Sequence, residues 1–132
     1  MTENDINLLL DEIISRINNA YTPYSKFNVV SGVIDQNGKK HFGVNVENRS
    51  YGLTMCAERN AIAAAVTNGM KTIKVIAVVA DTVGPISPCG ACREVISEFS
   101  SDDTIIILSN KNKVYKQYKI SELLPLAFRF DQ

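Results

Sequence analysis

The fold class of this chain is decided by eight residues, Ile73-Lys-Val-Ile-Ala-Val-Val-Ala80. Nearly all of them are β-branched or small and apolar, which is the composition of a strand that is buried on both faces. Such a strand lies in the centre of a sheet that helices cover on both sides. Residues 104–108 predict a second strand of the same kind. The sequence therefore predicts a layered α/β domain.

Outward from these two strands, helix-like and strand-like segments alternate along the chain. Apolar residues at helical spacing, alanine-rich composition and stop signals such as Asn68-Gly69 predict helices at residues 6–17, 56–67, 89–99 and 121–124. Strands are predicted at residues 27–34, 40–46, 73–80, 104–108 and 114–120. The pair Asn37-Gly38 joins the first two strands as a hairpin, and the polar character of the last strand places it at an edge. Because no linker or repeat divides the chain, residues 1–132 are expected to form one domain.

Length, composition and charge exclude several classes of protein. Of the 132 residues, 45% are hydrophobic and 21% are charged, as in ordinary globular proteins. Fourteen Lys and Arg balance fourteen Asp and Glu, which argues against a protein that binds nucleic acid through excess positive charge. No apolar run reaches the ~18 residues of a membrane span, and the acidic first residues do not resemble an export signal. We therefore expect a soluble, cytoplasmic protein.

Three cysteines fall in two clusters, with Cys56 alone and Cys89 paired with Cys92. An odd number of cysteines without an export signal does not match a disulfide framework. Each cluster lies at the start of a predicted helix, where free N–H groups stabilise thiolates. Three protein ligands to zinc leave one position for water, which is typical of a catalytic site. The spacing Cys-x-x-Cys also occurs in redox motifs and structural zinc ribbons, so by itself it leaves these alternatives open.

Glu58, two residues after Cys56, favours zinc catalysis. A carboxylate beside zinc-bound water can accept a proton and deliver it to a substrate nitrogen. Zinc deaminases combine a ligand two residues before a Glu with a later Pro-Cys-x-x-Cys, and this chain has Cys56-Ala-Glu58 and Pro88-Cys89-Gly-Ala-Cys92. Alone, Glu58 would be interpreted as a solvated acid in the first turn of a helix. The three cysteines change that interpretation.

Several further stretches extend this pattern: Tyr24-Ser-Lys-Phe27, Asn45-Val-Glu-Asn48, Tyr51, Cys56-Ala-Glu-Arg59, Ser87-Pro-Cys-Gly-Ala-Cys-Arg93 and Leu123-Leu-Pro-Leu-Ala-Phe128. With them the chain resembles, nearly end to end, cytidine deaminases of the small, homotetrameric, three-cysteine kind. The resemblance implies a three-layer α/β fold with a five-stranded mixed sheet flanked by helices. It also implies one zinc ion per chain and the hydrolysis of cytidine or deoxycytidine to uridine or deoxyuridine plus ammonia, a step of pyrimidine salvage.

The resemblance also assigns roles to individual residues. Zinc would be held by Cys56, Cys89 and Cys92, and Glu58 would transfer protons. The nucleoside would be bound by six residues, namely Phe27, Asn45, Glu47, Tyr51, Ala57 and Phe128. Asn45 and Glu47 would bind the ribose hydroxyls. Phe27 would pack on the nucleoside, and the backbone N–H of Ala57 would donate to the base carbonyl. Tyr51 and Phe128 complete the pocket, the latter by reaching a neighbouring subunit's site.

Residue types alone leave simpler interpretations open for some of these positions. Asn45 and Glu47 are also ordinary polar residues for a hairpin end, and Phe27 and Phe128 are ordinary core aromatics. Arg59 has a physical argument of its own. Zinc with three thiolates carries a formal charge of −1, so a nearby cation is needed to compensate the thiolates. The alternative for Arg59 is an exposed helix arginine.

Two other functions compete with cytidine deamination. Blasticidin S deaminases share the zinc pattern but lack the Asn45 to Asn48 stretch and the arginine at position 59, and a catalytically silent zinc-binding module is disfavoured by the intact Glu58. Editing deaminases that act on nucleic acid usually carry His at the first ligand position. The single histidine, His41, is expected to be a surface or half-buried residue. Arg49 departs from the family, which commonly has a small residue there.

Overall fold

In the computed structural model, which describes residues 1–130, five strands form one mixed sheet. The strands are β1 (Val29–Asp35), β2 (Lys40–Val44), β3 (Ile73–Ala80), β4 (Ser100–Asn110) and β5 (Tyr115–Tyr118). Their order is β2-β1-β3-β4-β5, with β3 and β4 parallel and the other neighbours antiparallel. The predicted central place of β3 and edge place of β5 are confirmed. The last two residues of the predicted domain, 131–132, lie outside the described residues.

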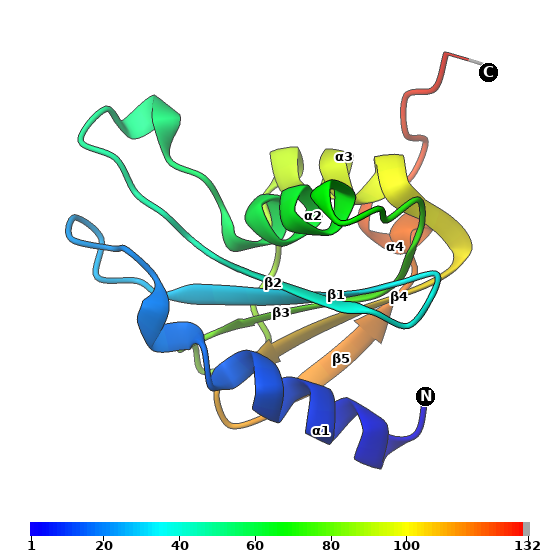
Figure 1. Ribbon diagram of the computed structural model, residues 1–132, viewed down its shortest axis with the longest axis horizontal. Coiled ribbons are helices and arrows are strands. Elements are labelled where there is room, and N and C mark those ends of the chain that lie inside the picture. The colour runs from blue at the N-terminus through cyan, green and yellow to red at the C-terminus, as the bar shows by residue number, and fades with distance from the viewer. Residues whose placement is uncertain (131–132) are drawn as a thin grey trace.

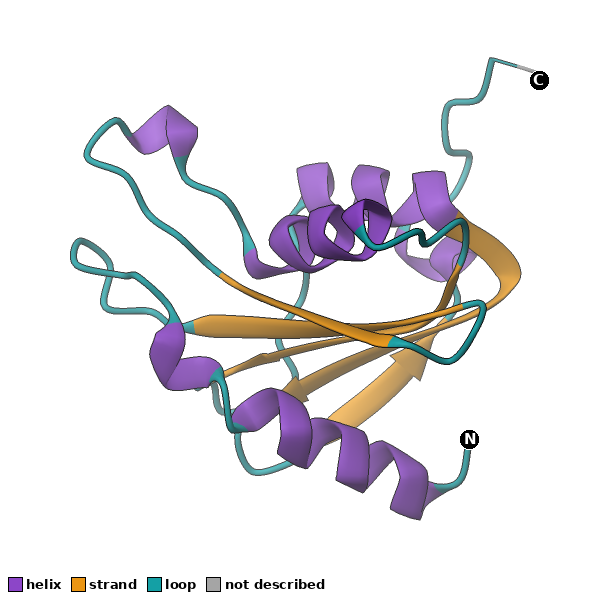
Figure 2. Ribbon diagram, viewed as in Figure 1, coloured by secondary structure: helices purple, strands orange, loops and turns teal. Residues whose placement is uncertain are grey.

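Helices cover both faces of the sheet, which gives three layers (Figure 1 and Figure 2). One face carries α1 (Glu3–Ile14), and the other carries α2 (Ala57–Thr67), α3 (Gly90–Phe99) and the short α4 (Ile120–Leu123). Two loops, residues 20–28 and 45–56, extend beyond the same end of the sheet (Figure 1). Among the described residues, no helix is long and apolar enough to cross a membrane.

The amphipathic first helix packs its apolar face on the sheet, as its periodicity predicts. Thr2 caps it, since the Thr2 hydroxyl accepts from the backbone N–H of Asp5 and the Asp5 carboxylate accepts from the N–H of Thr2. Leu10 and Ile13 are fully buried against β1 and β3. The helix ends earlier than predicted, at Ile14, because the chain then tightens into the 3₁₀ turn η1 (Ile17–Asn19).

Strand β4 begins four residues before the predicted start, immediately after α3. Its first residues are polar, so their composition gives no strand signal. Thr104 fixes this part of the strand, because its hydroxyl donates to the carbonyl of Ile73 at 2.6 Å and accepts from the N–H of Ser101 at 2.9 Å. Tertiary hydrogen bonds thus extend β4 where local sequence does not predict it.

Helix α2 rests directly on the backbone of β2 at Gly43. A Cβ atom at this position would lie 2.3 Å from the backbone nitrogen of Ala61 and 2.7 Å from the carbonyl oxygen of Ala57. The side-chain amide of Asn60 adds a hydrogen bond to the Val44 carbonyl at 2.8 Å. This close approach determines where α2 begins, and therefore where Cys56 and Glu58 lie.

Replacing Gly43 by Ala is expected to destabilise the fold by about 3 kcal/mol, since both clashing atoms belong to helix backbone and cannot rotate away. Urea denaturation of the two proteins measures the difference. Gly52→Ala is the matched control, because a Cβ there would have no neighbour within 4 Å. Equal unfolding midpoints for Gly43→Ala and the parent would mean that α2 shifts on the sheet at little cost.

The expectation for His41 as a surface or half-buried residue is wrong. Its side chain is buried, at 6% exposure for the residue, and its Nε2 lies 2.9 Å from Oδ2 of Asp35. Asp35 also accepts backbone hydrogen bonds from Asn37 and Lys39 across the hairpin turn. The pair thus ties both ends of the β1–β2 turn together, and this pairing gives the histidine a structural reason to be buried.

These hydrogen bonds give the fold a pH dependence at Asp35. The contact with His41, followed by the two backbone N–H groups, lowers the pKa of the Asp35 carboxyl. A pKa that is lower in the folded state means that ionised Asp35 stabilises the fold above about pH 4, and that this contribution is lost as the pH falls through the lowered pKa. We expect Asp35→Asn to unfold more easily than the parent at pH 5, with the difference shrinking toward pH 2. Denaturation curves at several pH values test this, and a pH-independent difference would contradict it.

Candidate active site

The three cysteines meet where two helices begin. Cys56 is the N-cap of α2, Cys89 is the N-cap of α3, and Cys92 lies in the first turn of α3. Their sulfur atoms all lie within 4.8 Å of one another. Neither N-cap cysteine makes a side-chain capping bond, so both thiols remain available as ligands at the positive ends of two helix dipoles.

The chemistry of this cluster fits a soft divalent cation. Tetrahedral Zn–S bonds of about 2.3 Å place sulfur atoms about 3.8 Å apart, so the cluster needs only a small contraction to hold zinc. Hydrogen bonding from Cys92, assisted by Arg59, lowers the pKa of the Cys56 thiol. The same contact together with burial raises the pKa of Cys92. The proton of Cys56 therefore leaves easily, and a cation bound at the cluster would offset the negative charge that holds the proton on Cys92.

Arg59, one helical turn after Cys56, brings a cation into contact with this cluster. Its Nη2 donates to Sγ of Cys56 at 3.4 Å. Its Nε is buried and has no hydrogen-bond partner among residues 1–130. Arg59 is half-buried and contacts Cys56, so the alternative of an exposed helix arginine does not describe it.

Glu58 lies in the first turn of α2 and is buried, with 5% of its surface exposed. Burial raises the pKa of its carboxyl, and the nearby Cys56 adds to the shift. A carboxyl group with a raised pKa holds a proton more readily than an exposed one, and it can return that proton at neutral pH. Among the acidic residues in the described chain, Glu58 is the one that combines burial with proximity to the cysteines.

A cavity of about 220 Å³ opens at this point, between the two extended loops and the starts of α2 and α3. Six of the predicted site residues line it: Phe27, Asn45, Cys56, Ala57, Glu58 and Cys89. Sequence reasoning missed Val29, Thr54, Ile86 and Ser87, which also line it. Ser87 directly precedes Pro88-Cys89, so its place beside a ligand was a usable signal. Thr54 and Ile86 lie in loops and carry no such signal.

Asn45 lines the cavity and also holds its wall in place. Its Oδ1 accepts from the N–H of Val29 at 2.9 Å, and its Nδ2 donates to the carbonyl of Phe27 at 2.8 Å. Strand β2 ends just before it, and the extended backbone continues through bridges of Val46 with Tyr21 and Met55. Asn45 therefore holds the end of the hairpin, as the simpler interpretation of this residue expects. Its Nδ2 keeps a second hydrogen to donate, and the binding of ribose by Asn45 stays a prediction.

Three of the six residues predicted to bind the nucleoside lie outside the lining of this cavity. The Glu47 carboxylate accepts from the backbone N–H groups of Tyr24 and Ser25 at 3.1 Å and from the Ser25 hydroxyl. Tyr51 is 75% exposed and makes an edge contact with the ring of Tyr24, 5.9 Å between centroids. Both residues therefore join the two extended loops, 20–28 and 45–56, to each other.

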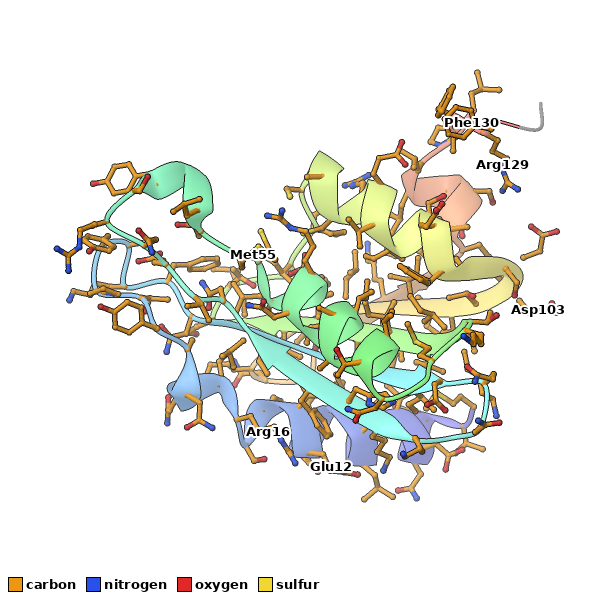
Figure 3. The ribbon with its side chains drawn as sticks, turned by 45° about the horizontal axis from the view of Figure 1, so that its top comes forward. Glu12, Arg16, Met55, Asp103, Arg129 and Phe130 are labelled. Carbon is orange, nitrogen blue, oxygen red and sulfur yellow. The ribbon has the colours of Figure 1, made fainter. Side chains whose placement is uncertain are left out.

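Phe128 is the third, and it belongs to the C-terminal segment after α4. It is 67% exposed and stacks edge-on with Phe130 at 5.2 Å. Figure 3 shows Phe130 and Arg129 at the end of this segment, on the far side of the helical layer from Met55, which immediately precedes the first cysteine. Within one chain, the structure does not bring Phe128 to the cavity.

Comparison with known proteins gives a consistent result. The model for the zinc-binding region of cytidine and deoxycytidylate deaminases matches residues 3–108. A cytidine deaminase from Sporosarcina psychrophila is 43% identical over 94% of this chain and 91% of its own length. Another from Halalkalibacterium halodurans is 44% identical over 94% of each chain. A blasticidin-S deaminase from Bacillus cereus is a more distant relative, 32% identical over 79% of each chain.

Solved structures agree with the sequence relatives. The crystal structure of cytidine deaminase from Burkholderia pseudomallei is similar with a TM-score of 0.89 and 39% identity, covering 97% of this chain and all of that one. This confirms the predicted three-layer fold. The zinc-binding family region and the three converging cysteines together also confirm zinc as the cofactor. The chain belongs to the cytidine and deoxycytidylate deaminase family.

Proposed function

We propose that this protein hydrolyses cytidine and 2'-deoxycytidine to uridine and 2'-deoxyuridine with release of ammonia, as a step of pyrimidine salvage. One observation carries the proposal: a single cavity is lined by Glu58, whose carboxyl is buried, and by two cysteines of a three-cysteine cluster suited to zinc. The relatives at 43% and 44% identity are named cytidine deaminases, which supports the nucleoside as substrate.

Cys56, Cys89 and Cys92 would hold the zinc ion, which when bound supplies the Lewis acidity that activates water at neutral pH. Glu58 performs the proton transfers. Its carboxylate takes a proton from the attacking water and passes it to the ring nitrogen of the base. It then moves a second proton to the amino group, which leaves as ammonia. The buried position of Glu58 keeps these protons away from bulk water.

The remaining site residues are proposed to bind the nucleoside. Phe27 lines the cavity as an apolar wall against which the base and sugar pack. The backbone N–H of Ala57, at the first position of α2, is free of helical bonds and is proposed to donate to the base carbonyl. Asn45 and Glu47 are proposed to bind the ribose hydroxyls. Arg59 is proposed to offset the charge of the three thiolates, which its contact with Cys56 supports.

A homotetramer is proposed from two exposed apolar surfaces. One is formed by the extended loops and includes Tyr24, Tyr51 and Leu53; the other is the C-terminal segment with Leu126, Phe128 and Phe130, the last of which is 98% exposed. Surfaces of this kind usually mark interfaces between proteins. They lie at different ends of the molecule, so a copy of the chain that covers one leaves the other for a second copy. In this arrangement Tyr51 and Phe128 complete pockets, and Phe128 does so for a neighbouring subunit.

The proposed surroundings of the protein follow from its thiols and charge. Three reduced cysteines that act as ligands suit a reducing compartment, which supports a cytoplasmic location. The zero net charge supports a small-molecule substrate rather than nucleic acid. We propose no membrane partner, and we treat residues 1–132 as one functional domain.

The direct test is incubation of the pure, zinc-loaded protein with cytidine while the ultraviolet absorbance of the cytosine ring is followed. Loss of that absorbance with equimolar release of ammonia supports the proposal. Turnover of blasticidin S without turnover of cytidine would assign the protein to the alternative deaminase. A protein that binds zinc but changes neither substrate would be the silent zinc-binding module.

Free cytosine is expected to be a much poorer substrate than cytidine. Contacts of Asn45 and Glu47 with the sugar would position the base for attack, so removing the sugar lowers the chemical rate as well as binding. We expect kcat/KM for cytosine to fall by two orders of magnitude or more, which is about 2.7 kcal/mol. Comparable values for the two substrates would show that these two residues serve only the protein's own loops.

A further inference from the structure

The guanidinium group of Arg93 makes three hydrogen bonds beside the active site, to two segments that are far apart in the sequence. Its Nε donates to the carbonyl of Pro88 at 2.9 Å, its Nη2 donates to the Ser87 hydroxyl at 2.7 Å, and its Nη1 donates to the carbonyl of Leu123 at 2.8 Å. Arg93 itself does not line the cavity. It is half-buried in the first turn of α3, directly after Cys92.

Two of these three contacts hold the residues immediately before Cys89. The segment between β3 and α3 has no regular structure, so its path depends on individual hydrogen bonds. The side-chain amide of Asn110 donates to the carbonyl of Val83 near the start of this segment, whereas the guanidinium of Arg93 binds Ser87 and Pro88, the two residues before Cys89. The backbone N–H of Arg93 also donates to the carbonyl of Cys89. The guanidinium of Arg93 thus holds the chain immediately before this cysteine, and the first turn of α3 holds the chain after it.

The third contact ties the same guanidinium to α4. Leu123 is the last residue of α4, and its carbonyl is one of those that a helix end leaves without an intrahelical partner. The segment that follows leads to Phe128. The side chain of Arg93 therefore links the loop that precedes Cys89 to the end of α4, where the C-terminal segment begins.

We propose that Arg93 is a positioning residue that presets Cys89 for zinc and thereby raises the affinity of the site for the metal; this rests on the proposed function only in taking the three cysteines as the zinc ligands. A planar fork with donors in several directions can serve three acceptors at once. A lysine at the same position keeps the charge but not the fork. Geometry rather than charge is therefore what the substitution Arg93→Lys removes.

The test compares zinc affinity of the full-length protein by competition with a coloured zinc chelator. Arg93→Lys is expected to bind zinc 10–100-fold more weakly than the parent, the range found when a group that orients a ligand is lost. With zinc in excess, its kcat for cytidine is expected to return close to that of the parent, because Arg93 does not touch the substrate cavity.

Arg16→Lys is the matched control. Arg16 is also half-buried and donates to a backbone carbonyl, that of Glu12, at 2.6 Å, with its guanidinium 3.7 Å from the centre of the Phe42 ring. It lies in the turn between α1 and η1, on the opposite face of the sheet from α2 and α3 (Figure 3). We expect Arg16→Lys to lower thermal stability while its zinc affinity stays equal to that of the parent.

A folded Arg93→Lys protein with the zinc affinity of the parent would overturn the proposal, and so would an equal loss of affinity in Arg16→Lys. If Arg93→Lys does not fold, Ser87→Ala decides, because it removes one acceptor from an exposed position. A severalfold loss of zinc affinity in Ser87→Ala supports the proposal, and an unchanged affinity overturns it. Zinc affinity is measured without substrate, so a failure of cytidine turnover in the parent would count against the proposed function and not against Arg93.

Discussion

Glu58→Gln lowers the rate of cytidine hydrolysis by about 10²–10⁴-fold while zinc stays bound; this is the expected result if the carboxyl group moves the protons. Glutamine has nearly the same shape as glutamate, so the buried position beside the cysteines stays filled. It cannot accept a proton from water or deliver one to the base. Steady-state rates at pH 7, together with zinc content by metal analysis, separate loss of proton transfer from loss of the metal.

The control for this variant is Glu12→Gln. Glu12 is a helix carboxylate paired with Lys40 on the surface, far from the cavity, and its loss should leave the rate unchanged. Glu58→Gln with full zinc and a rate within threefold of the parent would mean that another group transfers the protons. The buried carboxyl would then be a structural feature of α2 only.

Cys89→Ala is expected to reduce zinc affinity by more than the 10–100-fold that follows loss of an orienting neighbour, because it removes one of three ligands. The parent should contain about one zinc per chain, and the dialysed variant should contain a small fraction of that. Cytidine turnover should fall with the zinc content, since the residues of the cavity do not activate water by themselves. Metal analysis and rate measurements on the same samples check both expectations.

Cys89→His tests whether this effect is specific to the ligand. Imidazole is also a zinc ligand, and sites with two cysteines and one histidine occur in zinc enzymes. We expect this variant to keep more zinc than Cys89→Ala. A Cys89→Ala protein with full zinc and full activity would show that the cluster is completed by another donor.

The parts of the fold that could be predicted were those with a local signal. Strand β3 matches its predicted range, because eight consecutive residues carry the composition of a doubly buried strand. The helix starts at Cys56 and Cys89 followed from the alanine-rich stretch and from the prolines that precede α3. Since both ligand clusters lie at these starts, the metal site could be predicted together with the helices.

The parts that could not be predicted depend on partners far apart in the sequence. Neither Glu47 nor Ser25 reveals that one binds the other, because the contact exists only when two loops meet. The three acceptors of Arg93 include Leu123, thirty residues away along the chain. The position of His41 was predicted wrongly for a different reason. Its partner Asp35 is only six residues away, but the two side chains meet only when the β1–β2 hairpin forms. The sequence pattern therefore predicts which residues carry the chemistry. The hydrogen bonds that keep those residues in position depend on tertiary contacts and could not be predicted.

The convergence of α2 and α3 on one set of sulfur atoms makes the metal a cross-link as well as a cofactor. The ligands Cys56 and Cys89 come from two helices that β3 separates in sequence. A bound ion would close residues 56–89 into a loop. Because the three sulfur atoms meet only in the folded protein, the free energy of zinc binding would also stabilise the fold. The stability of the helical layer above the sheet then rises with the free zinc concentration, as RT ln(1 + [Zn]/Kd). Removal of zinc by a chelator would thus lower the unfolding temperature of this protein as well as its rate of turnover.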